Sequence, residues 1–115
     1  MSDDVDLLRG TLDLFILKTL TWGPMHGLAI VRWIERVTES RLSVEEGALY
    51  PALHRMEQRG LLDAEWGVTE QNRRAKFYRV TRRGRAQLER GTSTWERYVE
   101  VASRILSARH AGEVA

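Results

Sequence analysis

The chain has 115 residues, of which 43% are hydrophobic and 30% charged, and its formal net charge is +2 at pH 7. This length supports one hydrophobic core rather than two, and the composition is that of a folded globular domain rather than a disordered segment. The absence of cysteine excludes disulfide bonds, iron–sulfur clusters and thiol nucleophiles.

Two helices joined by a short turn are expected at the start of the chain. Over residues 5–20, apolar residues recur mostly at spacings of three and four, which is typical of one helical face, so a first helix should end near Trp22. Gly23 and Pro24 favour a stop after it. A second helix should end near Thr38. Its apolar face consists of Leu28, Ile30, Val31, Ile34 and Val37.

A third helix is expected from the capping-box pair Ser43 and Glu46 to a left-handed cap at Gly60. Proline is tolerated in the first turn of a helix but is costly deeper inside it. Pro51 therefore leaves two alternatives: the first turn is irregular, or the regular part of the helix begins shortly before Pro51. The apolar face of this helix consists of Leu49, Leu53 and Met56.

A helix that follows another helix after a short turn can lay its N-terminal residues in the major groove of DNA. The outward residues of the third helix are therefore candidate DNA contacts. The alternative is that Tyr50 is a half-buried packing residue and that His54 is merely solvated. The candidates are Gly47, Ala48, Tyr50, His54 and Arg55.

After Gly60 the sequence pattern changes to a period of two, which predicts two antiparallel strands. Leu62, Ala64 and Trp66 alternate with acidic residues, and residues 77–80 form a second run of β-favouring residues. Residues 67–75 between these runs are polar and too many for a tight hairpin. We expect them to form a flexible, basic tip.

Positive charge is concentrated in and after this hairpin. Residues 73–85 contain seven basic side chains and no acidic one. Arg73, Arg74 and Lys76 lie near the tip, where cationic groups can reach DNA phosphates or enter the minor groove, as a wing does. The alternative is a solvated, charged hairpin without a ligand.

A long final helix is expected from a cap at Thr81 toward Ala108, with a length of roughly 40 Å. Its apolar stripe needs a partner, most simply the same helix of a second subunit. Residues 91–94 are weak helix formers, so the helix either continues there or bends and restarts. Trp95 is also a candidate floor for a pocket that binds a flat aromatic ligand, with packing as the alternative. The predicted dimer-interface residues are Leu88, Trp95, Val99, Ala102 and Leu106.

These elements predict a mainly α protein with a small antiparallel β-hairpin, that is, a winged helix-turn-helix followed by a C-terminal dimerisation helix. We expect a winged-helix DNA-binding domain with the N-terminal helix over residues 1–81, the dimerisation helix over 82–110 and a disordered tail over 111–115. No apolar run approaches the ~20 residues of a membrane span, and residues 1–6 are acidic where a secretory signal would be basic. A cytoplasmic protein without membrane contact is expected.

No motif in the chain predicts catalysis. Glycine-rich phosphate loops and nucleophile–base motifs are missing from the sequence. A metal site could be argued only from His26, His54, Glu45 and Glu46, and no histidine pair has the spacing of zinc ligands. We expect no metal, no cofactor and no enzymatic activity.

Several stretches of the sequence match one known pattern: GTLDLFILKTL (residues 10–20), GPMHG (23–27), EEGALYPALHRMEQRGLL (45–62), AEWG (64–67) and NRRAKFYRVTRRGR (72–85), with Trp95 beyond them. YPALHRME (50–57) with the downstream KFYRVT (76–81) and TRRGR (81–85) is specific in combination. They resemble the PadR family, and the resemblance extends from Leu8 to about Leu106. It implies a dimeric winged-helix repressor, with Tyr50 and its neighbours at the DNA and the hairpin as wing. The dimer interface would be the C-terminal helix, aided by the N-terminal one.

The chain is similar to the shorter group of that family, which has a single C-terminal helix. Members that it resembles often respond to phenolic acids or hydrophobic cationic drugs, which implies a small aromatic or hydrophobic effector. Leu28 departs from the family pattern, which commonly has Tyr after the His–Gly pair.

The expected function is that of a sequence-specific transcriptional regulator, a repressor that binds double-stranded DNA as a homodimer on a pseudo-palindromic operator. The alternative belongs to a different class. It is a winged-helix protein-interaction module whose basic hairpin holds an acidic partner.

Overall fold

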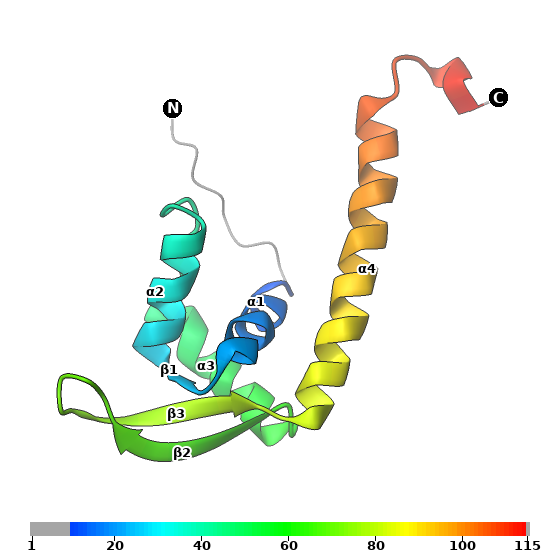
Figure 1. Ribbon diagram of the computed structural model, residues 1–115. Coiled ribbons are helices and arrows are strands. Elements are labelled where there is room, and N and C mark those ends of the chain that lie inside the picture. Colours follow the sequence, from blue (N-terminus) through cyan, green and yellow to red (C-terminus); the bar gives the residue numbers. More distant parts are fainter. Residues whose placement is uncertain (1–9, 115) are drawn as a thin grey trace.

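The computed structural model describes residues 10–114, and Figure 1 shows how their helices and strands are arranged. The elements are α1 (Leu12–Thr19), η1 (Leu20–Trp22), β1 (Met25–His26), α2 (Gly27–Val37), α3 (Glu46–Gln58), β2 (Leu62–Val68), β3 (Arg74–Val80), α4 (Arg82–Ser107) and η2 (Ala111–Val114). Three helices, a β-hairpin and a long C-terminal helix therefore follow one another in the winged-helix order, which confirms the predicted fold class.

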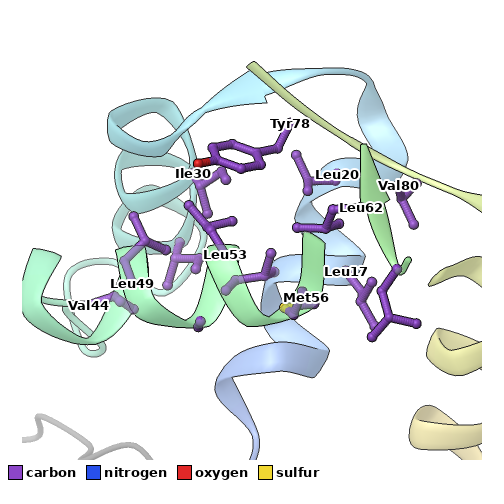
Figure 2. Close-up of a cluster of buried hydrophobic side chains, with 14 of the residues drawn as sticks. Leu17, Leu20, Ile30, Val44, Leu49, Leu53, Met56, Leu62, Tyr78 and Val80 are labelled. Atoms are coloured by element: carbon purple, nitrogen blue, oxygen red, sulfur yellow. The ribbon is translucent and has the colours of Figure 1, made fainter. Parts of the chain in front are cut away.

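The hydrophobic core lies where α1, α2 and α3 meet the inner half of the sheet (Figure 2). Apolar residues recur on one face of α2, so that face is buried and the charged residues of the helix stay in solvent. Because the core draws side chains from every one of these elements, it fixes α3 relative to the hairpin. The most deeply buried hydrophobic side chains are Ile16, Leu17, Leu20, Ile30, Leu49, Leu53, Met56 and Leu62.

The first helix begins later than its apolar pattern predicts. Gly10 lies in a turn with a φ of +85°, and α1 starts at Leu12. The earlier part of the predicted helix, residues 5–9, lies outside the described residues. The end agrees with the prediction, because η1 stops at Trp22 and Gly23 adopts a φ of +135° that side chains disfavour.

The start of α3 corrects the predicted capping box. Glu45, not Ser43, is the N-cap residue, and no side chain caps the helix. Val44 precedes the cap and is buried in the same core cluster as Leu49, four residues into the helix, as in a hydrophobic staple. Figure 2 shows both side chains at the same end of the core. Burial of Val44 thus sets where the helix begins.

Neither predicted alternative for Pro51 is correct. The helix is regular from Glu46, and Pro51 lies inside it as the sixth residue. Proline has no N–H to donate to the carbonyl group of Gly47, but Gly47 is exposed, so water can take the place of that hydrogen bond.

The end of α3 and the start of α4 are joined through one turn. Gly60 has a φ of +75° and donates to the carbonyl of Glu57, while Leu61 donates to that of Met56, which is the left-handed cap expected at this glycine. Thr81 caps α4 as predicted, because its hydroxyl oxygen accepts from the N–H of Gly84 at 3.0 Å. The same hydroxyl donates to the carbonyl of Gly60 at 2.7 Å. α4 is thereby anchored to the base of α3.

The sheet has a third strand that the sequence pattern did not reveal. Its order is β1-β3-β2, all antiparallel, and β1 pairs Met25 with Tyr78 and His26 with Phe77. Two residues are too few for a period of two to be visible.

The hairpin loop is shorter than expected. The strands pair as far as Val68 with Arg74, which leaves a loop of residues 69–73 instead of 67–75. The loop is closed by Thr69, whose N–H donates to the carbonyl of Arg73 and whose hydroxyl accepts from the N–H of Arg73. Asn72 supplies the positive φ of +60° that the turn requires.

The C-terminal helix α4 is continuous through residues 91–94, so the bend or restart allowed by the sequence does not occur. Arg97 donates to the hydroxyl groups of Ser93 and Thr94 within this weak stretch. Figure 1 shows α4 rising away from the body, and the longest dimension of the described chain is 62 Å. The helix is followed by the short turn η2; a disordered tail over 111–115 stays a prediction.

Candidate nucleic-acid interface

One face of the β-hairpin changes from apolar to cationic along its length. Paired residues lie on the same face of a sheet, and Leu62 with Val80 and Ala64 with Tyr78 form its inner, buried end. The next pairs on this face are Trp66 with Lys76 and Val68 with Arg74, which extend beyond the core. The same face that packs under α3 therefore presents two cations farther out.

A hollow of about 670 Å³ opens where this face meets α3 and the start of α2. We call it the wing hollow. It brings together four of the predicted DNA-binding residues, Tyr50 from α3 with Arg73, Arg74 and Lys76 from the hairpin. No aspartate or glutamate is found among the described residues that line it. The full lining is His26, Gly27, Leu28, Arg32, Tyr50, Trp66, Thr69, Gln71, Arg73, Arg74, Ala75, Lys76 and Tyr78.

The other predicted contacts of α3 do not line this hollow. Gly47, Ala48 and His54 are exposed on α3 but lie outside the wing hollow. Arg55 lies toward α1, where its guanidinium group is 3.6 Å from the carboxylate of Asp13. Of the predicted DNA contacts on α3, only Tyr50 therefore faces the wing hollow, and the other four lie elsewhere on the surface of the helix.

Tyr50 lies over the backbone of Gly27 at the start of α2. A Cβ atom placed on Gly27 would be 2.7 Å from the hydroxyl oxygen of Tyr50, so only glycine leaves room for the ring in this position. Tyr50 is nevertheless 45% exposed. The side chain is therefore held by packing on one side and is open to a ligand on the other.

The two strand cations of the wing hollow are held in different ways. Lys76 donates to the Glu57 carboxylate of α3 at 2.9 Å and lies 5.6 Å from the ring centroid of Tyr78. The hydrogen bond with Glu57 raises the pKa of Lys76 above its ordinary value. Arg74 lies 5.0 Å from the ring centroid of Trp66. Lys76 thus joins the hairpin to α3, whereas Arg74 keeps its charge available.

Burial raises the pKa of Tyr78, which lies at the inner end of this hollow, and Lys76 partly opposes that effect. Tyr78 therefore remains a neutral phenol well above neutral pH.

Two residues of the wing hollow were not among the predicted contacts. Trp66 lies in the alternating strand pattern, but its role beside Arg74 depends on the register of the hairpin. Arg32 comes from α2, well before the wing in the sequence. A single arginine on an amphipathic helix does not by itself predict a DNA contact. The fold brings it to the wing.

A second hollow, of about 750 Å³, lies between α1 and α4. We call it the α1–α4 hollow. Trp95, the predicted pocket residue, lines it together with Tyr98 of α4, and Asp13 and Leu14 come from α1.

The predicted dimer-interface residues differ in exposure. Leu88 is partly buried and packs against the core of its own chain, and Ala102 is half-buried. Trp95, Val99 and Leu106 are 36%, 41% and 84% exposed on α4. Their apolar surface is thus open in the single chain.

Within residues 10–114, no helix combines the length and apolar character required to cross a membrane. In the same part of the chain, no three histidine or acidic side chains come close enough to hold a metal ion. His26 instead accepts a hydrogen bond from the N–H of Ala29 as the N-cap of α2.

Comparison with known proteins identifies the family to which the fold belongs. The family model for the transcriptional regulator PadR-like family matches residues 16–90. A transcriptional regulator of Mycobacterium tuberculosis is 36% identical over 80 residues, which cover 70% of this chain and 71% of that protein.

Solved structures show the same similarity in three dimensions. A transcriptional regulator from Clostridium thermocellum has a TM-score of 0.79 at 29% identity, over 87% of this chain and 97% of that one. A PadR family transcriptional regulator from Eggerthella lenta has a TM-score of 0.74 at 29% identity, over 88% and 86% of the two chains. The chain therefore belongs to the PadR-like family, whose members are transcriptional regulators and not enzymes.

Proposed function

We propose that the chain regulates transcription as a homodimeric repressor that binds a pseudo-palindromic operator. In this proposal the outward residues of α3 enter the major groove, and the wing, defined as β2, β3 and the loop 69–73, contacts the flanking backbone. The α3 contacts are Gly47, Ala48, Tyr50, His54 and Arg55, and the wing contacts are Arg73, Arg74 and Lys76. Such a protein works where the DNA is, so a cytoplasmic location is part of the proposal.

The observation that carries this proposal is the wing hollow. It combines Tyr50 with Arg73 and Arg74 on a concave surface that has no acidic residue in its described lining. Arginine groups bind phosphate in a bidentate geometry, and most protein–DNA hydrogen bonds are made to phosphate and sugar. A solvated hairpin without a ligand would not explain why these cations gather beside α3.

The exposed stripe of α4 supports the homodimer. Monomeric proteins rarely leave such a contiguous apolar surface in water, and here it lies on a helix that projects from the body (Figure 1). We propose that α4 pairs with α4 of a second copy. Two recognition helices would then enter successive major grooves, about 34 Å apart.

The α1–α4 hollow is the proposed effector site. It is lined by Trp95 and Tyr98, whose rings can stack on a flat or hydrophobic ligand. It also includes Arg59 and Leu61 at the end of α3, so a ligand there would touch both the dimer helix and the base of the recognition helix. We propose that a small aromatic or hydrophobic molecule bound there relieves repression.

The first experiment titrates the protein against the promoter upstream of its own gene over a range of salt concentrations. Arg74→Ala should weaken binding to every sequence and reduce the slope of log affinity against log salt by about 0.9 for each phosphate that the variant no longer neutralises. Arg79→Ala is the control, because Arg79 is on the same strand but on the opposite face, beside Asp63. If Arg74→Ala changes neither affinity nor slope, the assignment of the wing is wrong.

The alternative function, an interaction module for an acidic partner, uses the same cations. It predicts that the wild-type protein forms no sequence-dependent, salt-sensitive complex with promoter DNA. The same titration therefore decides between the two functions.

A further inference from the structure

We propose that Arg32 of α2, together with Arg73 and Arg74 of the wing, holds one strand of the DNA backbone in the wing hollow. This inference rests on the proposed function and adds to it a third contact element, α2, besides the recognition helix and the wing. It also assigns the hollow to a phosphodiester strand rather than to base edges.

The geometry places cations on two sides of one concave surface. Arg32 comes from α2, whereas Arg73 and Arg74 come from the end of the hairpin, and all three line the wing hollow. Arg32 also lines an adjoining hollow of about 330 Å³ with Thr69, Glu70 and Gln71 of the hairpin loop, and Glu70 forms no ion pair with it. Figure 1 shows this loop rising on the side of the sheet where α2 begins. Arg32 therefore lies between the two hollows, on the side of α2 that faces the wing.

Ion pairs distinguish this group from three other cations of α3 and β3. Arg55, Lys76 and Arg79 each have a carboxylate within 4 Å, from Asp13, Glu57 and Asp63 respectively. No ion pair involves Arg32, Arg73 or Arg74 within residues 10–114. Three uncompensated arginines thus share a hollow whose described lining has no carboxylate.

Uncompensated cations that face one another repel, and an anion bound between them relieves that repulsion. Arginine fits phosphate better than lysine does, because its planar group donates two parallel hydrogen bonds. Cations on opposite sides of a hollow suit a strand that carries a charge at every nucleotide. Contacts of this kind position the protein on the duplex and carry no sequence information.

The test compares three variants of the full chain in binding to the promoter duplex and to an unrelated duplex of equal length. Arg32→Ala should weaken binding to both duplexes by the same factor and reduce the salt slope by about 0.9 for each phosphate left without its cation. Arg74→Ala should do the same. Arg97→Ala, which removes an equal charge from α4 outside the hollow, should change neither quantity. Arg32 is exposed, so its variant should keep the melting temperature of the wild type.

A second measurement locates the strand. Single phosphates of the promoter duplex are replaced by neutral methylphosphonates, and each substitution is tested with each variant. In the wild type, a methylphosphonate at a contacted phosphate should weaken binding. We expect one set of these substitutions to stop weakening binding in Arg32→Ala and another set to do so in Arg74→Ala. Both sets should lie on the same strand, within a few nucleotides of each other. The inference is overturned if Arg32→Ala binds like the wild type, or if the two sets lie on opposite strands, while the proposed function stands. If the wild type itself forms no salt-sensitive complex with either duplex, the proposed function and the inference both fail.

Discussion

Lys76 is the cation of the wing hollow whose charge is already compensated, because the carboxylate of Glu57 lies 2.9 Å from its ammonium group. Glu57→Gln keeps a hydrogen-bond acceptor but removes the negative charge beside the wing hollow. We expect tighter binding to DNA of any sequence and a salt slope steeper by up to about 0.9 per chain, since Glu57 then no longer competes with a phosphate for Lys76. Fluorescence anisotropy of a labelled duplex measures both.

The matched control is Glu100→Gln, which removes the partner of Arg104 on α4 and should leave the slope unchanged. Stability should change by less than about 1 kcal/mol in both variants, because the pairs are accessible to solvent. Weaker DNA binding by Glu57→Gln would contradict the prediction and would mean that the pair is needed to position the wing.

Because Glu57 raises the pKa of Lys76, the stabilisation from this pair is fully present below pH 10.5 and is lost as the pH rises through the raised pKa.

Gly27 controls the position of Tyr50. In Gly27→Ala the new Cβ would lie 2.7 Å from the hydroxyl oxygen of Tyr50, and the ring must rotate away. The ring end can move, so we expect stability to stay within about 1 kcal/mol of the wild type while operator affinity falls. Equilibrium denaturation and gel-shift titration measure these two effects.

The control for this prediction is the same substitution in a Tyr50→Ala background. With the ring removed, Gly27→Ala should have no further effect on DNA binding and should not lower the stability, because the atoms nearest to the new Cβ belong to the ring that is gone. An equal loss of affinity in both backgrounds would show that Gly27 acts without Tyr50.

At the scale of elements, the join between α4 and the rest of the fold depends on Gly84. A Cβ there would collide with the backbone carbonyl oxygen of Leu61, and backbone cannot move aside as a side chain can. Gly84→Ala should therefore destabilise the protein by about 1–3 kcal/mol, as overpacked sites do. Gly91→Ala is the comparison, because its Cβ would meet only the side chain of Leu14, and its helix propensity improves. Similar melting temperatures for the two variants would refute this account.

The sequence predicts the longer elements well because their signals are local. The apolar faces of α2 and α3, the glycine cap at Gly60 and the threonine cap at Thr81 each depend on residues within a few positions of one another. The errors arise where packing in the core or pairing with another strand decides. Burial of Val44 overrides the capping box of α3, and the two-residue strand β1 exists only because it pairs with β3.

The candidate site shows the same division. The cluster of arginines in residues 73–85 is visible in the sequence, and so is the helix that carries Tyr50. The tertiary fold decides the rest. It brings these residues into one hollow, pairs Lys76 with Glu57 and places Arg32 of α2 beside the wing. Sequence patterns identify which residue types gather, whereas the core determines which of them face the same space.

At the scale of the whole molecule, the proposed operator-reading surface and α4 extend in different directions from the three-helix core (Figure 1). The wing hollow lies between α2, α3 and the hairpin, while the exposed residues of α4 lie along the helix that leaves the body. A second copy can therefore bind along α4 without covering the wing hollow.

Pairing through α4 can be tested with two valines of the same helix. Val99 belongs to the predicted interface, and Val101 lies two residues on, about 200° around the helix. Both are exposed in the single chain, so an aspartate at either position should leave the fold intact. Val99→Asp should yield a monomer by sedimentation, because a charge cannot be buried in an apolar seam without a partner. Val101→Asp should stay dimeric.

Since a dimer binds its second half-site at a high effective concentration, the operator affinity of Val99→Asp should fall by about 10²-fold or more. A Val99→Asp protein that remains dimeric, or a monomer that binds the operator as tightly as the wild type, would refute the proposed assembly.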